Sequence, residues 1–260
     1  MLRNLQEIKS YAIGATDGDF GHVNDLFFDD QSWCIRYFVA QAGSLLLSHK
    51  VLISPYSIAG ADWEHKRLAL HASQRQVKDG PQFDTWKPVT RRQEMCNARH
   101  FGYPYYWAGD VELGDGLHMP HLRPTDYLAA RTQAAALAAD DPHLHSCKAL
   151  VGLHVHANDG DVGHISGMLV DEDGWVMRYL VVDTSNWWMG NQVLIPPEWI
   201  TSLSWSDSKA NVDLSRKTIK NSPRYESSAA LNRAQEANLY DHYDRLNYWE
   251  REHARELVSA

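Results

Sequence analysis

Nine residues near the start of the chain, Ala15-Thr16-Asp17-Gly18-Asp19-Phe20-Gly21-His22-Val23, return later as Ala157-Asn158-Asp159-Gly160-Asp161-Val162-Gly163-His164-Ile165. At the same offset, residues 33–39 return as 175–181, and residues 51–55 return as 193–197. A gap-free register sustained over about a hundred residues is typical of a duplicated structural unit. We therefore expect two tandem modules with the same order of strands.

Each copy reads as a series of short antiparallel strands. Asp17-Gly18 and Asp159-Gly160 lie between apolar runs, where glycine supplies the positive φ that a tight hairpin turn requires. Five or six short strands suit a small barrel, because closure removes the exposed edges of a sheet. The expected fold class is mainly β: two tandem small antiparallel β-barrels, each followed by a helical tail, with an α-helical linker between them.

Helix signals follow each set of strands. Ser73 and Ser215 are each expected to cap a single helical turn. Thr90 and Asn232 each precede a Gln by three residues, as in a capping box, and predict the start of a tail helix. Asp126 is expected to cap an Ala-rich helix. The predicted organisation is a first module with its tail at residues 1–107, a linker with the Ala-rich helix at 108–144, and a second module with a C-terminal helix at 145–260.

Composition and charge disfavour several classes of function. The chain has 260 residues and a net charge of −8, without a dense run of Lys or Arg, which disfavours direct nucleic-acid binding. We expect no signal peptide and no transmembrane segment, because no apolar stretch approaches the roughly 20 residues of a membrane span. The three cysteines form no Cys-x-x-Cys pair and are typical of reduced thiols, so a cytoplasmic location is expected.

The order of three motifs carries a family resemblance. These are the Asp-Gly-Asp-x-Gly-His turn, an Arg-Tyr pair inside an apolar strand, and a Val-Leu-Ile-x-Pro strand. Over residues 1–83 and 145–225 the chain resembles the PRC-barrel family, which is named after the cytoplasmic domain of the photosynthetic reaction centre H subunit and includes a ribosome maturation factor. The doubled layout is similar to stand-alone bacterial PRC-barrel proteins. The resemblance implies a small closed barrel that serves protein contacts and assembly without a cofactor.

Two departures from the family separate this chain from its named members. The reaction centre subunit has a membrane helix before its barrel, and the sequence predicts none here. The maturation factor pairs one such barrel with a different N-terminal barrel, whereas this chain carries two alike. Neither of these functions is carried over to this chain.

The histidines are the first candidates for chemistry. His154 and His156 would share one strand face, and His118, His121, His143 and His145 cluster near the linker. The first copy has Ala12 and Gly14 where the second has His154 and His156, so we expect no metal site. His22 and His164 occur in both copies, and we expect them to anchor the hairpins by hydrogen bonds rather than to transfer protons.

Other motifs are interpreted as structural. Arg36 and Arg178 lie in apolar strands, and we expect each to form a partly buried ion pair, with Asp29 and Asp171 respectively. Nucleophile elbows, phosphate-binding loops and dinucleotide fingerprints are missing from the sequence, so we expect no enzyme, no catalytic residues and no cofactor.

The strongest candidate for an interaction surface is a pair of apolar loops at matching positions of the two copies. A connection between strands is normally polar, and apolar residues there need a cover. The cover can be the rest of the same module or a partner protein, and the sequence leaves both alternatives open. The candidate residues are Leu45, Leu46, Leu47, Trp187, Trp188 and Met189.

We therefore expect a non-enzymatic PRC-barrel protein that acts as a protein-interaction or assembly scaffold, with protein partners and a homo-oligomeric state. One alternative is a ribosome- or RNA-associated assembly factor, for which the acidic charge favours contact with a basic ribosomal protein. A second alternative is a sensor that binds a small ligand or a metal.

Overall fold

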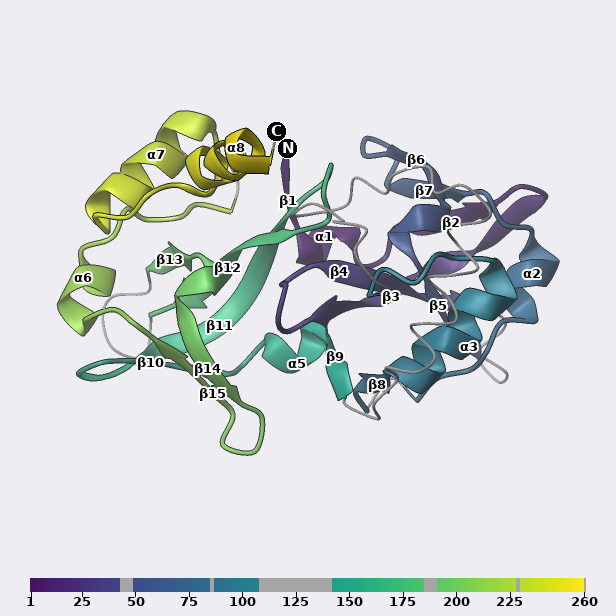
Figure 1. The fold of residues 1–260 in the computed structure, drawn as a ribbon, viewed down its shortest axis with the longest axis horizontal. Helices are drawn as coiled ribbons and strands as arrows, with labels where there is room; N and C mark the ends of the chain where they lie inside the picture. The colour runs from purple at the N-terminus through teal and green to yellow at the C-terminus, as the bar shows by residue number, and fades with distance from the viewer. Residues whose placement is uncertain (43–48, 85–86, 108–141, 185–190, 228–229, 260) are drawn as a thin grey trace. The chain divides into compact units, whose positions relative to one another are not determined.

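The computed structural model describes residues 1–42, 49–84, 87–107, 142–184, 191–227 and 230–259. These residues form a mainly β protein with two sheets, as the sequence predicts (Figure 1). The chain divides into two units. The N-terminal unit holds Leu5–Ala149 and Glu172–Val176, and the C-terminal unit holds Met1–Asn4, Leu150–Asp171 and Met177–Ala260.

The sheet of the N-terminal unit has the order β5-β4-β3-β2-β7-β6. Most neighbours pair antiparallel, and β2 with β7 pairs parallel. The strands are β2 (Ala12–Ala15), β3 (Gly18–Asp29), β4 (Ile35–Ala42), β5 (His49–Ile53), β6 (Ile58–Asp62) and β7 (Arg67–Leu70).

The sheet of the C-terminal unit repeats this plan as β13-β12-β11-β10-β15-β14, again with one parallel pair, β10 with β15. This shared order confirms the duplication that the sequence predicts. The strands are β10 (His154–Ala157), β11 (Gly160–Asp171), β12 (Met177–Asp183), β13 (Gln192–Ile195), β14 (Ile200–Ser204) and β15 (Lys209–Val212).

The sheets differ from the expected closed barrels. Among the described residues, no ladder joins β5 to β6 or β13 to β14, so each sheet remains open. The two end strands are instead consecutive along the chain, joined through the 3-10 turns η1 (Pro55–Ser57) and η2 (Pro197–Trp199). Each 3-10 turn carries the chain from one end strand of its sheet to the other.

The predicted turns and helix caps are confirmed. Gly18 and Gly160 have φ values of 138° and 131° at the β2–β3 and β10–β11 turns. The aspartates before them also cap the single helical turns α2 (Gln74–Lys78) and α6 (Arg216–Lys220). Asp17 Oδ1 accepts from the Gln74 N–H, and Asp159 Oδ1 accepts from the Arg216 N–H, each at 2.7 Å.

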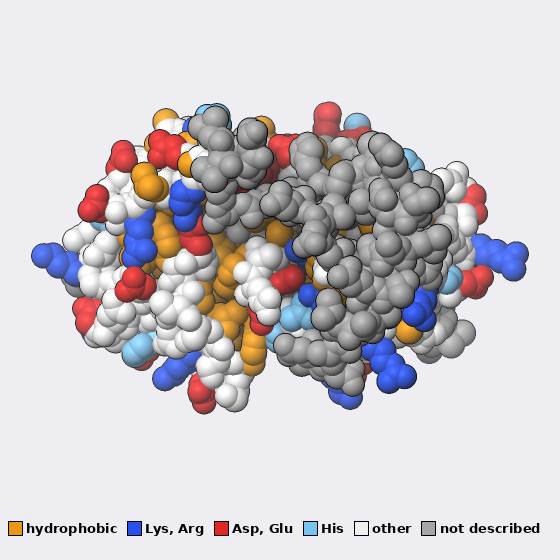
Figure 2. Space-filling model, viewed as in Figure 1, with side chains coloured by type: hydrophobic (Ala, Val, Ile, Leu, Met, Phe, Trp, Pro, Cys, Tyr) orange, Lys and Arg blue, Asp and Glu red, His pale blue; other side chains and the backbone are white. Residues whose placement is uncertain are grey.

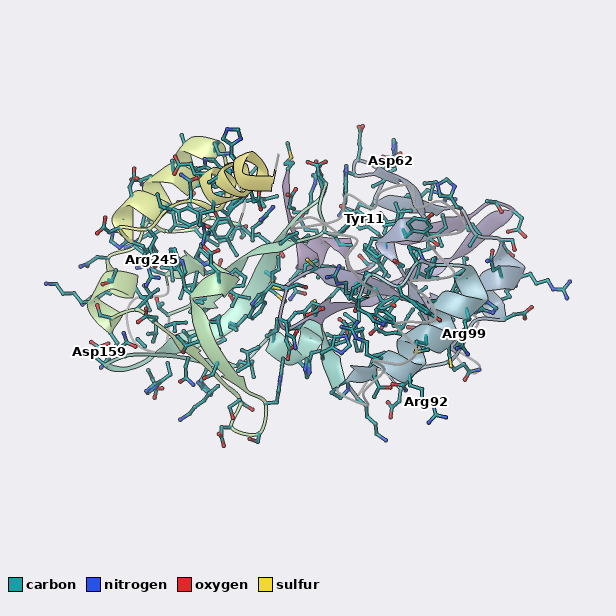
Figure 3. All side chains as sticks on the ribbon, viewed as in Figure 1. Tyr11, Asp62, Arg92, Arg99, Asp159 and Arg245 are labelled. Carbon is teal, nitrogen blue, oxygen red and sulfur yellow. The ribbon has the colours of Figure 1, made fainter. Side chains whose placement is uncertain are left out.

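The tail helices also begin where the sequence predicts. Capping boxes at Thr90 and Asn232 start α3 (Arg91–Phe101) and α7 (Arg233–His242), and α8 (Tyr248–Ser259) follows. Arg92 and Arg99 lie on the exposed face of α3, away from the sheet (Figure 3). In the described ranges, no helix is both long and apolar enough to span a membrane.

The two repeats exchange their first strands, which the sequence does not predict. The first strand of the chain, β1 (Leu2–Asn4), pairs antiparallel with β11. The strand at the matching position of the second repeat, β9 (Pro142–Ser146), pairs with β3 and with the short β8 (Val89–Thr90). Short helices α1 (Leu5–Ile8) and α5 (Cys147–Leu150) follow the exchanged strands. Leu144 of β9 thereby joins the N-terminal core with Phe27, Tyr37, Val39, Leu52 and Val89.

The turn between β11 and β12 belongs to the N-terminal unit as well. The carbonyl of Trp175 accepts from the Ile35 N–H at 2.7 Å, and the Trp175 ring meets Phe38 edge-on at 4.8 Å. Trp175 has a φ of 52° and is 6% exposed. A bulky residue with positive φ is uncommon, and here the buried ring contacts offset its cost.

Cleavage of the linker should leave the two halves of the chain associated. We expect fragments cut at a protease site inserted within residues 108–141 to co-elute in size exclusion, because β1 and β9 each pair with strands of the other fragment. Adding Arg3→Pro and His145→Pro, which remove ladder N–H groups, should weaken this association. Separation of the fragments without those prolines would contradict the exchange.

Candidate functional site

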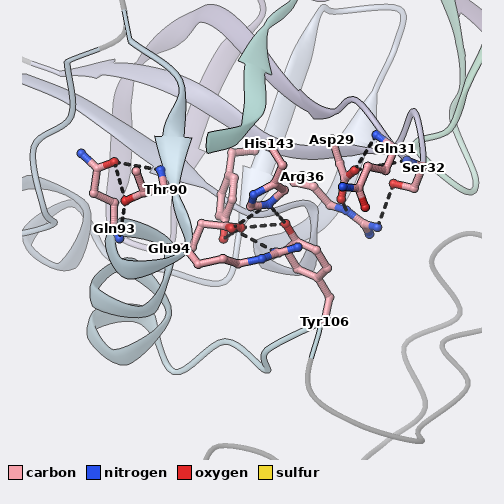
Figure 4. Close-up of polar contacts among 11 residues, drawn as sticks. Asp29, Gln31, Ser32, Arg36, Thr90, Gln93, Glu94, Tyr106 and His143 are labelled. Carbon is pink, nitrogen blue, oxygen red and sulfur yellow. Dashed lines mark hydrogen bonds and ion pairs between the residues drawn. The ribbon is translucent and has the colours of Figure 1, made fainter. Parts of the chain in front are cut away.

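A buried carboxylate in the N-terminal unit gathers four polar side chains, and we call this set the Glu94 cluster (Figure 4). Glu94 is 0% exposed. Its Oε2 accepts from the hydroxyls of Tyr37 at 3.1 Å and Tyr106 at 2.8 Å. Its Oε1 accepts from Arg91 Nη1 and lies beside His143 Nε2, both at 3.1 Å.

Local sequence explains why Glu94 points inward. The capping box at Thr90 sets the start of α3, so Glu94 falls in the first turn on the helix face that holds buried Met95 and Ala98. A carboxylate near a helix N-terminus is favoured by the helix dipole. Arg91, three residues earlier, lies on the same face of the helix and supplies a positive charge.

A second layer of contacts surrounds Tyr106. The Arg36 guanidinium stacks over the Tyr106 ring at 4.0 Å, and its Nε lies 3.8 Å from Asp29 Oδ2. Asp29 Oδ1 accepts from the Gln31 and Ser32 backbone N–H groups at 2.9 and 3.1 Å (Figure 4). The predicted Arg36–Asp29 ion pair is confirmed, and it ties the β3–β4 turn to the tail.

The C-terminal unit repeats the arrangement around Glu236, which we call the Glu236 cluster. Glu236 is 4% exposed. Its Oε2 accepts from Tyr179 at 2.9 Å and Tyr248 at 3.2 Å, and Arg233 Nη1 lies 3.5 Å from its Oε1. The guanidinium of Arg178 stacks over Tyr248 at 4.1 Å.

The ion pair predicted for Arg178 is also confirmed. Its Nη2 lies 3.5 Å from Asp171 Oδ2. Its Nη1 makes a further ion pair with Glu252 Oε1 at 2.5 Å, which involves α8.

The two clusters differ at one position. His143 contacts Glu94, whereas the residue at the matching place in the other repeat is Met1, whose terminal ammonium lies 3.9 Å from Asp171 Oδ1. His143 reaches Glu94 because β9 is the exchanged strand. Tyr106 precedes residues 108–141 in the sequence and His143 follows them. Glu94 therefore contacts one residue from each side of this segment.

The electrostatics favour neutral tyrosines in both clusters. Burial, and then the negative charge of Glu94, raise the pKa values of Tyr37 and Tyr106 well above the ordinary range. Burial is also the main cause that raises the pKa of Tyr248 to about 12. These phenols therefore act as hydrogen-bond donors to the carboxylates at neutral pH, and the clusters fasten the helical tails to the sheets.

The histidines highlighted by the sequence lie elsewhere. His22 is exposed on β3 opposite Ala12, and His164 is half-buried on β11 opposite His154. His156 Nδ1 lies 2.7 Å from Asp161 Oδ1. Among the described residues, no hydrogen bond anchors the hairpins through the rings of His22 and His164, and that expectation stays a prediction. Both histidines face the surface as strand residues.

Several predicted residues lie outside the described part of the chain. They are His118, His121, the Ala-rich helix after Asp126, and all six candidate interaction residues, Leu45, Leu46, Leu47, Trp187, Trp188 and Met189.

Sequence reasoning did not assign the two carboxylate clusters. The available signal was the recurrence of Glu94 as Glu236 among apolar helix positions, together with the Tyr-Trp pair at matching places, 106–107 and 248–249. A charged residue repeated at a core-facing position indicates a buried partner, because an unpaired buried carboxylate is costly.

No protein-family model matches the chain, and the curated proteins include no significant match to it.

Removing one hydroxyl from a cluster should destabilise the fold. We expect Tyr179→Phe to lower the free energy of unfolding by about 1.5–3 kcal/mol, because a hydrogen bond to a buried charge is lost. Urea denaturation followed by circular dichroism measures this change. Tyr56→Phe, at a half-exposed position, is the matched control. Equal stability of the two variants would contradict the proposed role of the cluster.

The raised tyrosine pKa values predict alkaline sensitivity. Burial raises the pKa of Tyr243 and of Tyr248 from 10.0 to about 12. A folded-state pKa above the unfolded value gives stability that is complete below pH 10 and is lost as pH rises towards 12. Urea denaturation across this range should show the decline, and Tyr248→Phe should make it shallower. A slope that is identical in the variant would contradict this assignment.

Proposed function

We propose that this chain is a non-enzymatic scaffold protein of the PRC-barrel type, which presents surfaces to protein partners and self-associates. The observation that carries the proposal is the burial of the two carboxylate clusters. Glu94 and Glu236 are 0% and 4% exposed, and their oxygens are occupied by donors from the same unit. A substrate would have no access to either carboxylate, so the strongest clusters of ionisable groups serve the framework.

The family relationship is part of this proposal. It rests on the order of the three sequence motifs. The open sheets depart from the closed barrel that the resemblance implies. A family whose members serve assembly through β-rich modules fits a chain that carries two such modules.

Surface charge favours a protein partner over nucleic acid. On the face shown in Figure 2, the coloured acidic and basic side chains are interspersed, without a continuous basic patch. Together with the net charge of −8, this disfavours binding that depends on neutralising phosphates.

The proposed contact surface is centred on the loop with Trp187, Trp188 and Met189, and on its counterpart with Leu45, Leu46 and Leu47. The residues that flank the first loop are held together, since Thr184 donates through its N–H and its hydroxyl to the Asn191 carbonyl at 3.0 and 2.8 Å. A surface hollow of about 290 Å³ lies beside them, lined by Thr184, Asn191, Val193, Ile219 and Arg224 among others. Tryptophan is enriched among the residues that anchor interfaces, so the Trp pair between Thr184 and Asn191 in the sequence suits such a role.

Replacing both tryptophans tests the proposal. We expect Trp187→Ser with Trp188→Ser to keep the melting temperature but to lose self-association in light scattering and to lose the partners recovered by affinity purification from native cells. Tyr56→Ser, at an exposed site in the other unit, is the control. Earlier melting with unchanged association would show that the loop belongs to the core. Recovery of ribosomal proteins would favour the assembly-factor alternative.

A further inference from the structure

A row of ligand-type side chains crosses the sheet of the C-terminal unit. The register places His154 of β10 directly opposite His164 of β11, and His164 directly opposite Asp183 of β12. Directly opposed residues point to the same face of a sheet. Two imidazoles and a carboxylate therefore stand next to one another on three adjacent strands.

The histidine pair has the closer of the two antiparallel geometries. The Ile165 N–H donates to the Leu153 carbonyl at 2.9 Å. The backbone hydrogen bonds of the ladder therefore join the residues on either side of His154 and His164, and these two residues form a non-hydrogen-bonded pair. In such non-hydrogen-bonded pairs the Cα atoms are only about 4.5 Å apart, and the side chains approach closely. His154 is exposed and His164 is half-buried, and neither ring accepts or donates a hydrogen bond within the described ranges.

We propose that His154 and His164 form an exchangeable binding site for a divalent late transition metal such as Zn²⁺ or Ni²⁺, with the Asp183 carboxylate as the third protein ligand. Imidazole nitrogen suits these ions, and water completes the coordination of an exposed site. Among the described residues, no three such groups stand at coordinating distance as the side chains lie, so the site forms by rotation of surface side chains. Binding is therefore weak and reversible, and the fold does not depend on it.

The structure selects a different pair from the one considered in the sequence. Val162 of β11 is an extra residue in the ladder between Val155 and His156, so His156 lies opposite Asp161. His156 binds Asp161 instead, and this hydrogen bond is the first cause that lowers the pKa of Asp161. His154 is left facing His164.

The other repeat provides a natural comparison. The matching row of the N-terminal sheet contains Arg67, Ala12, His22 and Gln41. One histidine without a carboxylate makes no chelating set. The proposed site is therefore specific to the second repeat.

Titration of the tag-free chain with ZnCl2 or NiCl2 in an isothermal calorimeter tests the site. We expect His154→Ala and His164→Ala each to remove one metal equivalent, whereas His156→Ala and His22→Ala retain it. Asp183→Asn should weaken binding about tenfold, as loss of one ligand from a small set would. Circular dichroism verifies that each variant is folded.

Two results would overturn the proposal. One is equal metal uptake by the unmodified chain and the His154→Ala/His164→Ala double variant. The other is a loss of the equivalent in His156→Ala but not in His164→Ala. The repeat also allows a gain of function, since Ala12→His places an imidazole opposite His22. We expect this variant to take up one further equivalent, bound more weakly because Gln41 stands where the proposed site has Asp183. No gain in the folded variant would contradict the proposal that the opposed histidine pair is the basis of the site.

Discussion

The fold depends on a buried carboxylate in each unit. Glu94 and Glu236 sit where a helical tail meets a sheet, and a charge in that position costs several kcal/mol unless donors surround it. Each carboxylate binds a strand tyrosine, a tail tyrosine and an arginine one helical turn earlier. The tail must therefore return to the sheet after its helix, because only the second tyrosine completes the set.

The same constraint explains the role of the exchanged strands. His143 reaches Glu94 on β9, and Leu144 from the same strand completes the core beside Tyr37. The cation–π contacts of Arg36 and Arg178 then couple each cluster to the turn that precedes its strand. Strand exchange, tail docking and turn geometry are thus linked through one group of polar contacts in each unit.

Duplication leaves the two repeats free to diverge at the surface while the framework is retained. The Glu-Tyr-Arg sets recur in both units, whereas Ala12 in the row across the first sheet is replaced by His154 in the second. Such a change is tolerated because the position lies outside the packed core.

The sequence by itself determined the duplication, the mainly β character, the hairpin turns at Gly18 and Gly160 and the capped starts of α3 and α7, because these follow from local chain geometry. It also predicted the ion pairs of Arg36 and Arg178, which join residues near each other in a hairpin. Only the tertiary structure decided that the sheets stay open and that Glu94 meets Tyr37 and His143. The tertiary structure also decided that β1 pairs with the second repeat and β9 with the first. Two repeats offer equivalent edges to each strand, so local sequence cannot choose between them, and the choice is made by long-range packing.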